Sequence, residues 1–122
     1  MPDQSWGVRL ERIGPAVMVS PSGELRGRSV DRLREIVRSR EPGLELLVLD
    51  LRDLVDLGDD GIAFLVEECA ARGAETSYEL AIVAGPPCRR RLEADPRCAG
   101  LVLHDAPEDL LAPYRERRGA RR

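Results

Sequence analysis

Five aspartates crowd a short stretch in the middle of the chain: Asp50, Asp53, Asp56, Asp59 and Asp60. Hard cations such as Mg²⁺ prefer carboxylate oxygens, so aspartates that converge could form the metal site of an enzyme. Carboxylates strung through one loop need not converge, however. A phosphate-accepting aspartate in a receiver-type domain would also need a lysine late in the chain, and all 19 basic side chains are arginine. We therefore expect neither a bound metal nor a cofactor.

The remaining reactive side chains form no catalytic set. His104 is the single histidine, and the sequence places no serine or cysteine beside it. Cys69, Cys88 and Cys98 are odd in number and lack the spacing of metal ligands, which indicates free thiols. Three consecutive arginines at 89–91 could bind an acidic partner or a nucleotide, although a solvated helix face is the simpler interpretation. We expect a protein without enzymatic activity.

The composition indicates one folded domain. The 122 residues carry a net charge of -3, which disfavours a nucleic-acid binder. Aromatic residues make up only 3% of the chain, so aliphatic side chains must build the core. No apolar run approaches the ~20 residues of a membrane span, and the polar start is unlike a signal peptide. We expect a cytoplasmic protein that neither binds nucleic acid nor inserts into a membrane.

The acidic stretch lies between a predicted strand and a predicted helix. Residues 46–51 read Leu-Leu-Val-Leu-Asp-Leu, a nearly unbroken apolar run that is typical of a strand covered on both faces. From residue 62, apolar side chains recur at i, i+3, i+4 and i+7, which predicts a helix. Loops that leave a central strand and enter a helix commonly hold functional residues in α/β folds. The function should therefore depend mainly on residues 52–61.

The rest of the chain alternates between strand and helix patterns. Further strands are predicted at 7–13, 16–19, 78–84 and 101–103, and further helices at 29–41, 88–94 and 106–117. Ser29 is the expected N-cap of the first helix, and Gly73 the expected end of the second. Pro113 is expected to kink or cut the last helix. This order predicts an α/β domain with a mostly parallel or mixed sheet.

The order of elements and four landmarks together resemble the STAS domain, the fold of bacterial anti-sigma factor antagonists and of the cytoplasmic tails of sulfate transporters. The landmarks are Gly23-Glu24-Leu25, Val48-Leu49-Asp50-Leu51, Gly58-Asp59-Asp60-Gly61-Ile62 and Gly73. The resemblance covers nearly the whole chain. It implies a single STAS-like domain with a mixed sheet of four to five strands and helices packed mainly on one face. The core would span about 7–114, followed by an Arg-rich tail at 115–122.

The resemblance also implies a protein partner. Antagonists of this family bind an anti-sigma factor that is also a kinase, and phosphorylation of a serine or threonine just before the loop glycine abolishes binding. Aligned on Gly61, that position is Asp60, and the two residues before it are Gly58 and Asp59. No hydroxyl side chain lies between Ser39 and Thr76. The sequence therefore implies the partner type without the phosphorylation switch.

Asp60 has two interpretations. A carboxylate at a helix N-terminus accepts bonds from free N–H groups and complements the helix dipole, so Asp59 and Asp60 could be ordinary helix caps. Alternatively, Asp60 supplies a fixed negative charge where the family adds a phosphate, although one carboxylate is a weaker charge than a phosphate.

The predicted partner-binding surface surrounds this loop and the start of the second helix. Phe64 falls about 200° from Ile62 at 100° per residue, so it is expected to be exposed as a binding anchor between acidic side chains. The expected contact residues are Asp56, Asp59, Asp60, Gly61, Phe64, Glu67 and Glu68. The first hypothesis is an antagonist that binds an anti-sigma factor or kinase-type protein. The alternative is a STAS subunit of a transport or lipid-trafficking complex that binds without phosphorylation.

Overall fold

A computed structural model of the chain describes residues 6–39, 43–75 and 78–120. Of the predicted Arg-rich tail at 115–122, residues 115–120 belong to the last helix, and the final two lie outside the described residues. The elements are β1 (Trp6–Ile13), β2 (Ala16–Leu25), α1 (Arg28–Arg38), β3 (Leu46–Asp50), β4 (Leu54–Leu57), α2 (Asp59–Glu75), β5 (Glu79–Val83), α3 (Pro86–Glu93), the 3-10 helix η1 (Pro96–Cys98), β6 (Leu103–His104) and α4 (Glu108–Ala120).

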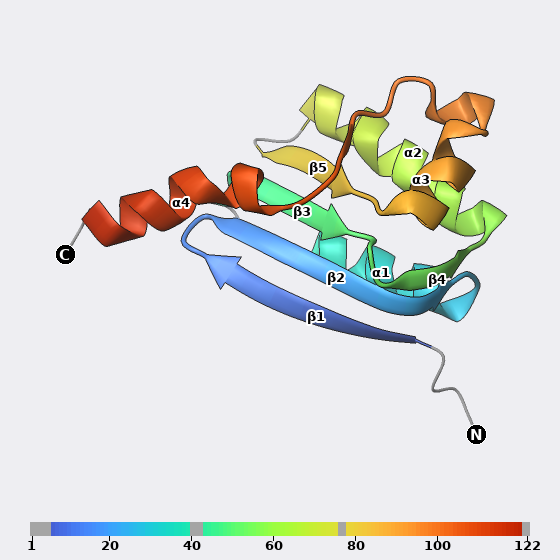
Figure 1. The fold of residues 1–122 in the computed structure, drawn as a ribbon, viewed down its shortest axis with the longest axis horizontal. Coiled ribbons are helices and arrows are strands. Elements are labelled where there is room, and N and C mark those ends of the chain that lie inside the picture. The colour runs from blue at the N-terminus through green and yellow to red at the C-terminus, as the bar shows by residue number, and fades with distance from the viewer. Residues whose placement is uncertain (1–5, 40–42, 76–77, 121–122) are drawn as a thin grey trace.

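One mixed sheet forms the centre of the molecule (Figure 1). Its strand order is β1-β2-β3-β5-β6, and β4 pairs with the far end of β2. The β1–β2 hairpin is antiparallel, and every other pair is parallel. The predicted α/β class and mixed sheet are confirmed, and β4 is one strand more than the sequence predicts.

The sheet is covered on both faces. Alternate residues of β3 enter two separate clusters, Leu47 and Leu49 on one side and Leu46 and Val48 on the other. The first cluster contains the buried side chains of α1, α2 and α3, and the second contains Leu111 of α4. This two-sided burial is what the apolar run at 46–51 predicts. It also places three of the four helices on one face.

The second strand is longer than predicted. β2 continues through Pro21 and Gly23 to Leu25, pairing with β3 over residues 16–19 and with β4 from Gly23. Pro21 lies between these two pairings, where its missing N–H removes no ladder bond. The extension places the end of β2 beside the acidic stretch, and residues 54–57 of that stretch form β4 instead of a loop.

Three helix predictions are wrong: the N-cap of the first helix, the end of the second, and a cut of the last helix near Ala112. The first helix has Gly27 as its N-cap, while the single O–H of Ser29 is directed at the preceding turn, with its Oγ 2.7 Å from the Glu24 carbonyl oxygen and 2.9 Å from the Arg26 carbonyl oxygen. The second helix passes through Gly73 to Glu75, because glycine lowers helix propensity by only about 1 kcal/mol. The last helix continues through Pro113, held by the packing of its other side chains on the sheet.

None of the helices in the described residues is long and apolar enough to cross a membrane.

Candidate partner-binding site

The junction between β4 and α2 is fixed against the end of β2. The Gly58 N–H donates to the Leu25 carbonyl at 3.0 Å, and the Ile62 N–H donates to the Gly58 carbonyl at 3.0 Å. A Cβ on Gly61 would lie 2.8 Å from the Leu25 carbonyl oxygen and 2.9 Å from Leu57 Cδ1. Only glycine fits this position without displacing backbone. The start of α2 is therefore a rigid platform for the two aspartates between these glycines.

Asp60 connects the N-termini of two helices. Its Oδ2 accepts a hydrogen bond of 2.7 Å from the N–H of Gly27, the N-cap of α1. Gly27 has φ 61°, a conformation that glycine adopts without strain. The Asp60 side chain remains exposed, so its charge lies at the surface and near the positive ends of both helix dipoles. This bond of Asp60 thus caps α1, whereas the sequence interpretation has this carboxylate cap its own helix, α2.

Asp59 faces a group of arginines on the other side of the junction. Its Oδ1 lies 3.1 Å from Arg91 of α3 and 3.8 Å from Arg97 of η1. Arg97 also pairs with Asp95 at 2.8 Å. The hydrogen bonds from the Arg97 side chain and N–H lower the pKa of Asp95 to about 2. Asp59 thus belongs to an exposed network that joins α2 to α3 and η1.

The other three aspartates point to separate partners. Asp50, buried at the end of β3, accepts two hydrogen bonds of 2.9 Å from the Arg52 guanidinium, and these bonds raise the pKa of Arg52. Asp53 pairs with Arg9 at 3.6 Å, and Asp56 pairs with Arg26. Within the described residues, no three potential metal ligands gather in one place. Four of the five carboxylates therefore pair with arginines, and the fifth, Asp60, bonds to the Gly27 N–H.

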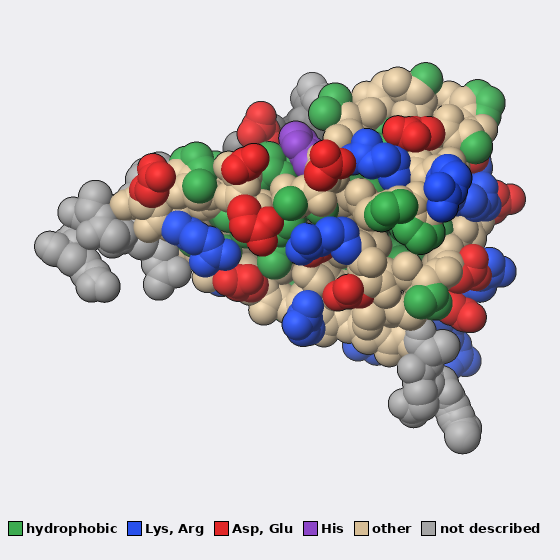
Figure 2. Space-filling view, in the orientation of Figure 1, with side chains coloured by type: hydrophobic (Ala, Val, Ile, Leu, Met, Phe, Trp, Pro, Cys, Tyr) green, Lys and Arg blue, Asp and Glu red, His purple; other side chains and the backbone are tan. Residues whose placement is uncertain are grey.

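Two adjoining depressions lie on the surface at this end of the sheet. One is lined by Arg26, Gly27, Gly58, Asp59, Asp60 and Arg91. The other is lined by Leu54, Val55, Asp56, Leu57, Pro87, Cys88 and Arg91. Arg91 borders both, and burial raises the pKa of Cys88 to about 11, which keeps this thiol protonated at neutral pH. Charges of both signs line the two depressions, and they are interspersed over the visible face of the molecule as well (Figure 2).

Val55 and Arg91 are surface residues of the site that no sequence pattern predicts there. Val55 is 79% exposed, although it lies in an apolar-rich stretch. Leu54 and Leu57 are buried at the two ends of β4, whereas Val55 is exposed and Asp56 is half-buried. A strand alternates its side chains with period two, and this stretch shows no such alternation that would have indicated the exposure of Val55. Arg91 reaches Asp59 across 32 residues of sequence, and no local pattern indicates that pairing.

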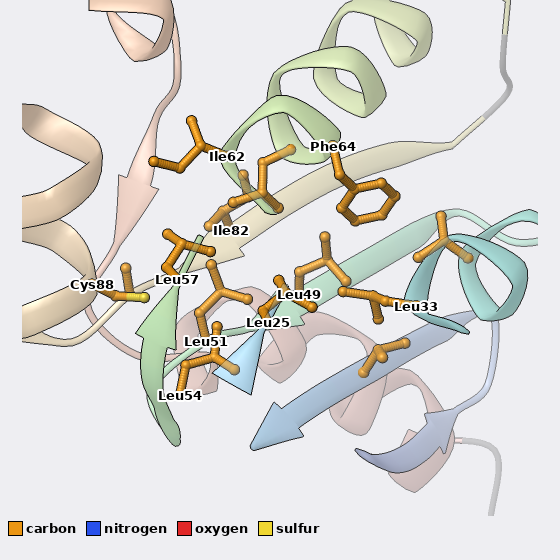
Figure 3. Packing of buried hydrophobic residues seen from close by; sticks show 14 of the residues in the cluster. Leu25, Leu33, Leu49, Leu51, Leu54, Leu57, Ile62, Phe64, Ile82 and Cys88 are labelled. Atoms are coloured by element: carbon orange, nitrogen blue, oxygen red, sulfur yellow. The ribbon is translucent and has the colours of Figure 1, made fainter. Parts of the chain in front are cut away.

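The predicted exposure of Phe64 is wrong. Phe64 is 0% exposed, and its ring lies in the main core cluster with Leu33 and Leu49 (Figure 3). The Arg34 guanidinium lies over the ring, 5.4 Å from its centroid. The helical phase fails because α2 packs on α1 as well as on the sheet, so its buried arc is wider than the sheet-facing stripe. Phe64 stabilises the core and offers no accessible anchor.

The two glutamates of the predicted surface also differ from each other. Glu68 is buried at 2% exposure and lies 3.6 Å from Arg38 of α1. Glu67 is exposed and lies 3.6 Å from Arg34. Both carboxylates therefore pair with α1. Of the predicted contact residues, Asp59, Asp60 and Glu67 are exposed, Asp56 is half-buried, and Gly61 is buried at the helix start.

Similarity to solved structures confirms the fold. An anti-sigma factor antagonist from Mycobacterium paratuberculosis is similar to the chain, with a TM-score of 0.71 and 24% identity, over 91% of this chain and 95% of that one. The STAS-like fold that the sequence predicts is thereby confirmed. The structure of Mglu is similar with a TM-score of 0.55 and 19% identity, over 61% of this chain and only 18% of that one. No model of a known family and no curated protein matches the sequence.

Proposed function

We propose that this protein is a non-enzymatic binding module, similar to an anti-sigma factor antagonist, that binds an anti-sigma factor or kinase-type protein and so regulates transcription in the cytoplasm of a bacterium. The observation that supports this function best is the exposure of Asp59 and Asp60 at the start of α2, in a fold shared with an anti-sigma factor antagonist. The loop position that carries the phosphorylation switch in that family thus presents a permanent carboxylate.

The chemistry of the site suits a protein partner. Val55 offers an exposed apolar side chain in the same depression as Asp56 and Arg91, and Asp59 and Asp60 line the adjoining depression. Protein interfaces commonly combine an apolar centre with a charged rim, and the rim charges set the association rate and the choice of partner. The contact set that we propose is therefore Val55, Asp56, Asp59, Asp60 and Arg91, with Phe64 and Glu68 supporting the helix from inside.

The Asp60–Gly27 bond supports constitutive binding. Asp60 has the role of a structural cap, because its carboxylate is held by the α1 N-cap. No hydroxyl side chain is available between Ser39 and Thr76, so a kinase partner would find no acceptor in the loop. Binding would then be controlled by the amounts of the two proteins.

The experiment is a calorimetric titration of candidate anti-sigma factors with the wild type, Val55→Asp and Asp59→Arg. Both substitutions replace exposed side chains, so the fold should survive, which circular dichroism checks. We expect each to weaken binding at least tenfold. Val102→Asp is the matched control, because Val102 is also an exposed apolar side chain (72%) but lies outside the site. Equal affinity for all four proteins would overturn the proposed surface.

The missing acceptor keeps the alternative open: a STAS subunit of a transport or lipid-trafficking complex that binds its partner without phosphorylation. The same surface would serve that function. Affinity purification of the tagged protein from its native cell distinguishes the two. A kinase-like anti-sigma factor among the bound proteins supports the first function, and a permease or ATPase supports the alternative.

A further inference from the structure

The two edges of the sheet differ greatly in length. β6 at one edge has two residues, whereas β1 at the other edge has eight. In Figure 1, β1 is the outermost strand, and no helix or strand lies beyond it. It pairs with β2 over all eight residues without a bulge, and it contains no proline. Folded proteins usually shorten, kink or cover such an edge, because its free N–H and C=O groups can pair with another strand.

The direction of the free backbone groups follows from β2. The carbonyl of Pro15 accepts a bond from Glu45, and the N–H of Gly23 donates to Asp53. Odd-numbered residues along β2 therefore point toward β3 and β4, and even-numbered ones point toward β1. In the β1–β2 register, each odd-numbered residue of β2 faces an even-numbered residue of β1, as Val19 faces Leu10. Because the backbone groups of odd-numbered β2 residues point away from β1, those of their partners on β1 point away from β2. The outward N–H and C=O groups of β1 therefore belong to its even-numbered residues.

The charges of β1 select one way to pair with a second copy. In an antiparallel pair of β1 strands, residues whose backbone groups point outward must face each other. The two-fold axis that relates the two copies therefore passes midway between one residue and the same residue of the second copy. An axis at Leu10 places Arg9 opposite Glu11 of the second copy and Leu10 opposite itself. An axis one residue earlier places Arg9 opposite Arg9, and one residue later places Glu11 opposite Glu11. Opposite charges stabilise facing strands and like charges destabilise them, so the axis at Leu10 is favoured.

Leu10 gives this arrangement an apolar centre. It is 51% exposed and is the one large exposed apolar side chain of β1. The present partners of the two charged residues hold them weakly: Arg9 pairs with Asp53 at 3.6 Å and Glu11 with Arg115 at 3.4 Å, all four side chains being about half exposed or more. Exposed pairs of this kind contribute little, so both residues are available to a second strand.

We propose that β1 is the contact strand of a homodimer, in which two copies pair their β1 strands antiparallel about Leu10 and join their sheets. The contact is symmetric and uses up the long edge of both copies, so assembly stops at two. A single pair of edge strands is a small interface, and the dimer is therefore in equilibrium with the monomer. The proposal is independent of the function proposed for the acidic junction.

The first test measures mass by sedimentation equilibrium over a range of concentrations. The wild type should rise from the 13.5 kDa of one chain toward twice that mass. Arg9→Glu and Glu11→Arg should each weaken dimerisation at least tenfold, because each places like charges opposite each other. Mixed in equal amounts, the two variants should form a heterodimer, since every Arg of one then faces a Glu of the other. The double variant with both substitutions should dimerise like the wild type.

The controls separate the strand contact from a change in folding or from another interface. Leu10→Asp should also weaken dimerisation, whereas Val102→Asp, at the other large exposed apolar position outside the acidic junction, should not change it. Thermal unfolding checks that each variant is folded. The proposal is overturned if the wild type stays monomeric at every concentration. That holds even if β1 is found to pair with a strand of a different protein. A dimer unaffected by both charge reversals overturns it as well.

Discussion

The carboxylate of Asp60 accepts a hydrogen bond of 2.7 Å from the N–H of Gly27, 33 residues earlier in the chain. The bond joins the start of α2 to the N-cap of α1. It therefore gives a structural role to Asp60, the residue that the proposed alignment on Gly61 places at the phosphoacceptor position. The same carboxylate remains at the surface, where it can also meet a partner.

Loss of this bond should destabilise the fold. We expect Asp60→Ala to lower the free energy of unfolding by about 1 kcal/mol, because it leaves the Gly27 N–H without its side-chain acceptor. Asp60→Asn retains an acceptor oxygen and should cost less. Chemical denaturation of the three proteins measures both differences. Equal stability of the alanine variant and the wild type would contradict a stabilising role for the Asp60–Gly27 hydrogen bond.

Gly61 should tolerate no side chain. Gly61→Ala places a methyl group 2.8 Å from the Leu25 carbonyl oxygen, and forced overpacking of this kind typically costs about 1–3 kcal/mol. Gly100→Ala is the matched control, because a Cβ there meets nothing within 4 Å. Thermal unfolding should show a clear decrease in the melting temperature for the first variant only. A normal melting temperature for Gly61→Ala would show that β2 and α2 are less tightly packed than described.

Phe64→Ala should unfold the protein more easily without a specific effect on binding. The ring is fully buried and among the largest side chains of the core, and truncating such a residue costs about 3–5 kcal/mol. Val55→Ala, at an exposed position, should leave stability nearly unchanged. Denaturation curves of both variants measure this contrast. A stable Phe64→Ala protein with reduced partner affinity would restore the exposed-anchor interpretation.

The sequence predicts the sheet and its covering better than it predicts the site. Residues 46–51 indicate a strand buried on both faces because apolar side chains occupy both of its alternating sets. The phase of α2 is harder to predict, since Phe64 is buried by α1, an element whose position no local pattern gives. Likewise, the presence of Asp60 at a helix start is readable from the sequence. Its bond to Gly27 depends on how two separate βα junctions meet in space.

The Asp95–Arg97 contact should make stability depend on pH in the acidic range. Hydrogen bonds from Arg97 lower the pKa of Asp95 from 3.8 to about 2 in the folded protein. The resulting stabilisation is complete above the unfolded pKa near 4 and is lost as the pH falls toward 2. Asp95→Asn should therefore reduce the pH dependence of the melting temperature between pH 4 and 2. An unchanged pH profile in that variant would contradict the assigned pKa.

The sign of one affinity change distinguishes the two roles of the Asp60 charge. Asp60→Asn can keep the bond to Gly27 while it removes the charge, so the helix junction should stay in place. If a partner is built to accept this carboxylate, the variant should associate a few-fold more slowly and with a smaller dependence on salt. We expect this result, because a carboxylate that caps α1 is a constant part of the surface. If the charge instead imitates a phosphate that repels the partner, Asp60→Asn should bind more tightly. Stopped-flow association and titration at two salt concentrations measure both quantities, with Glu67→Gln as a control for the loss of a nearby exposed carboxylate.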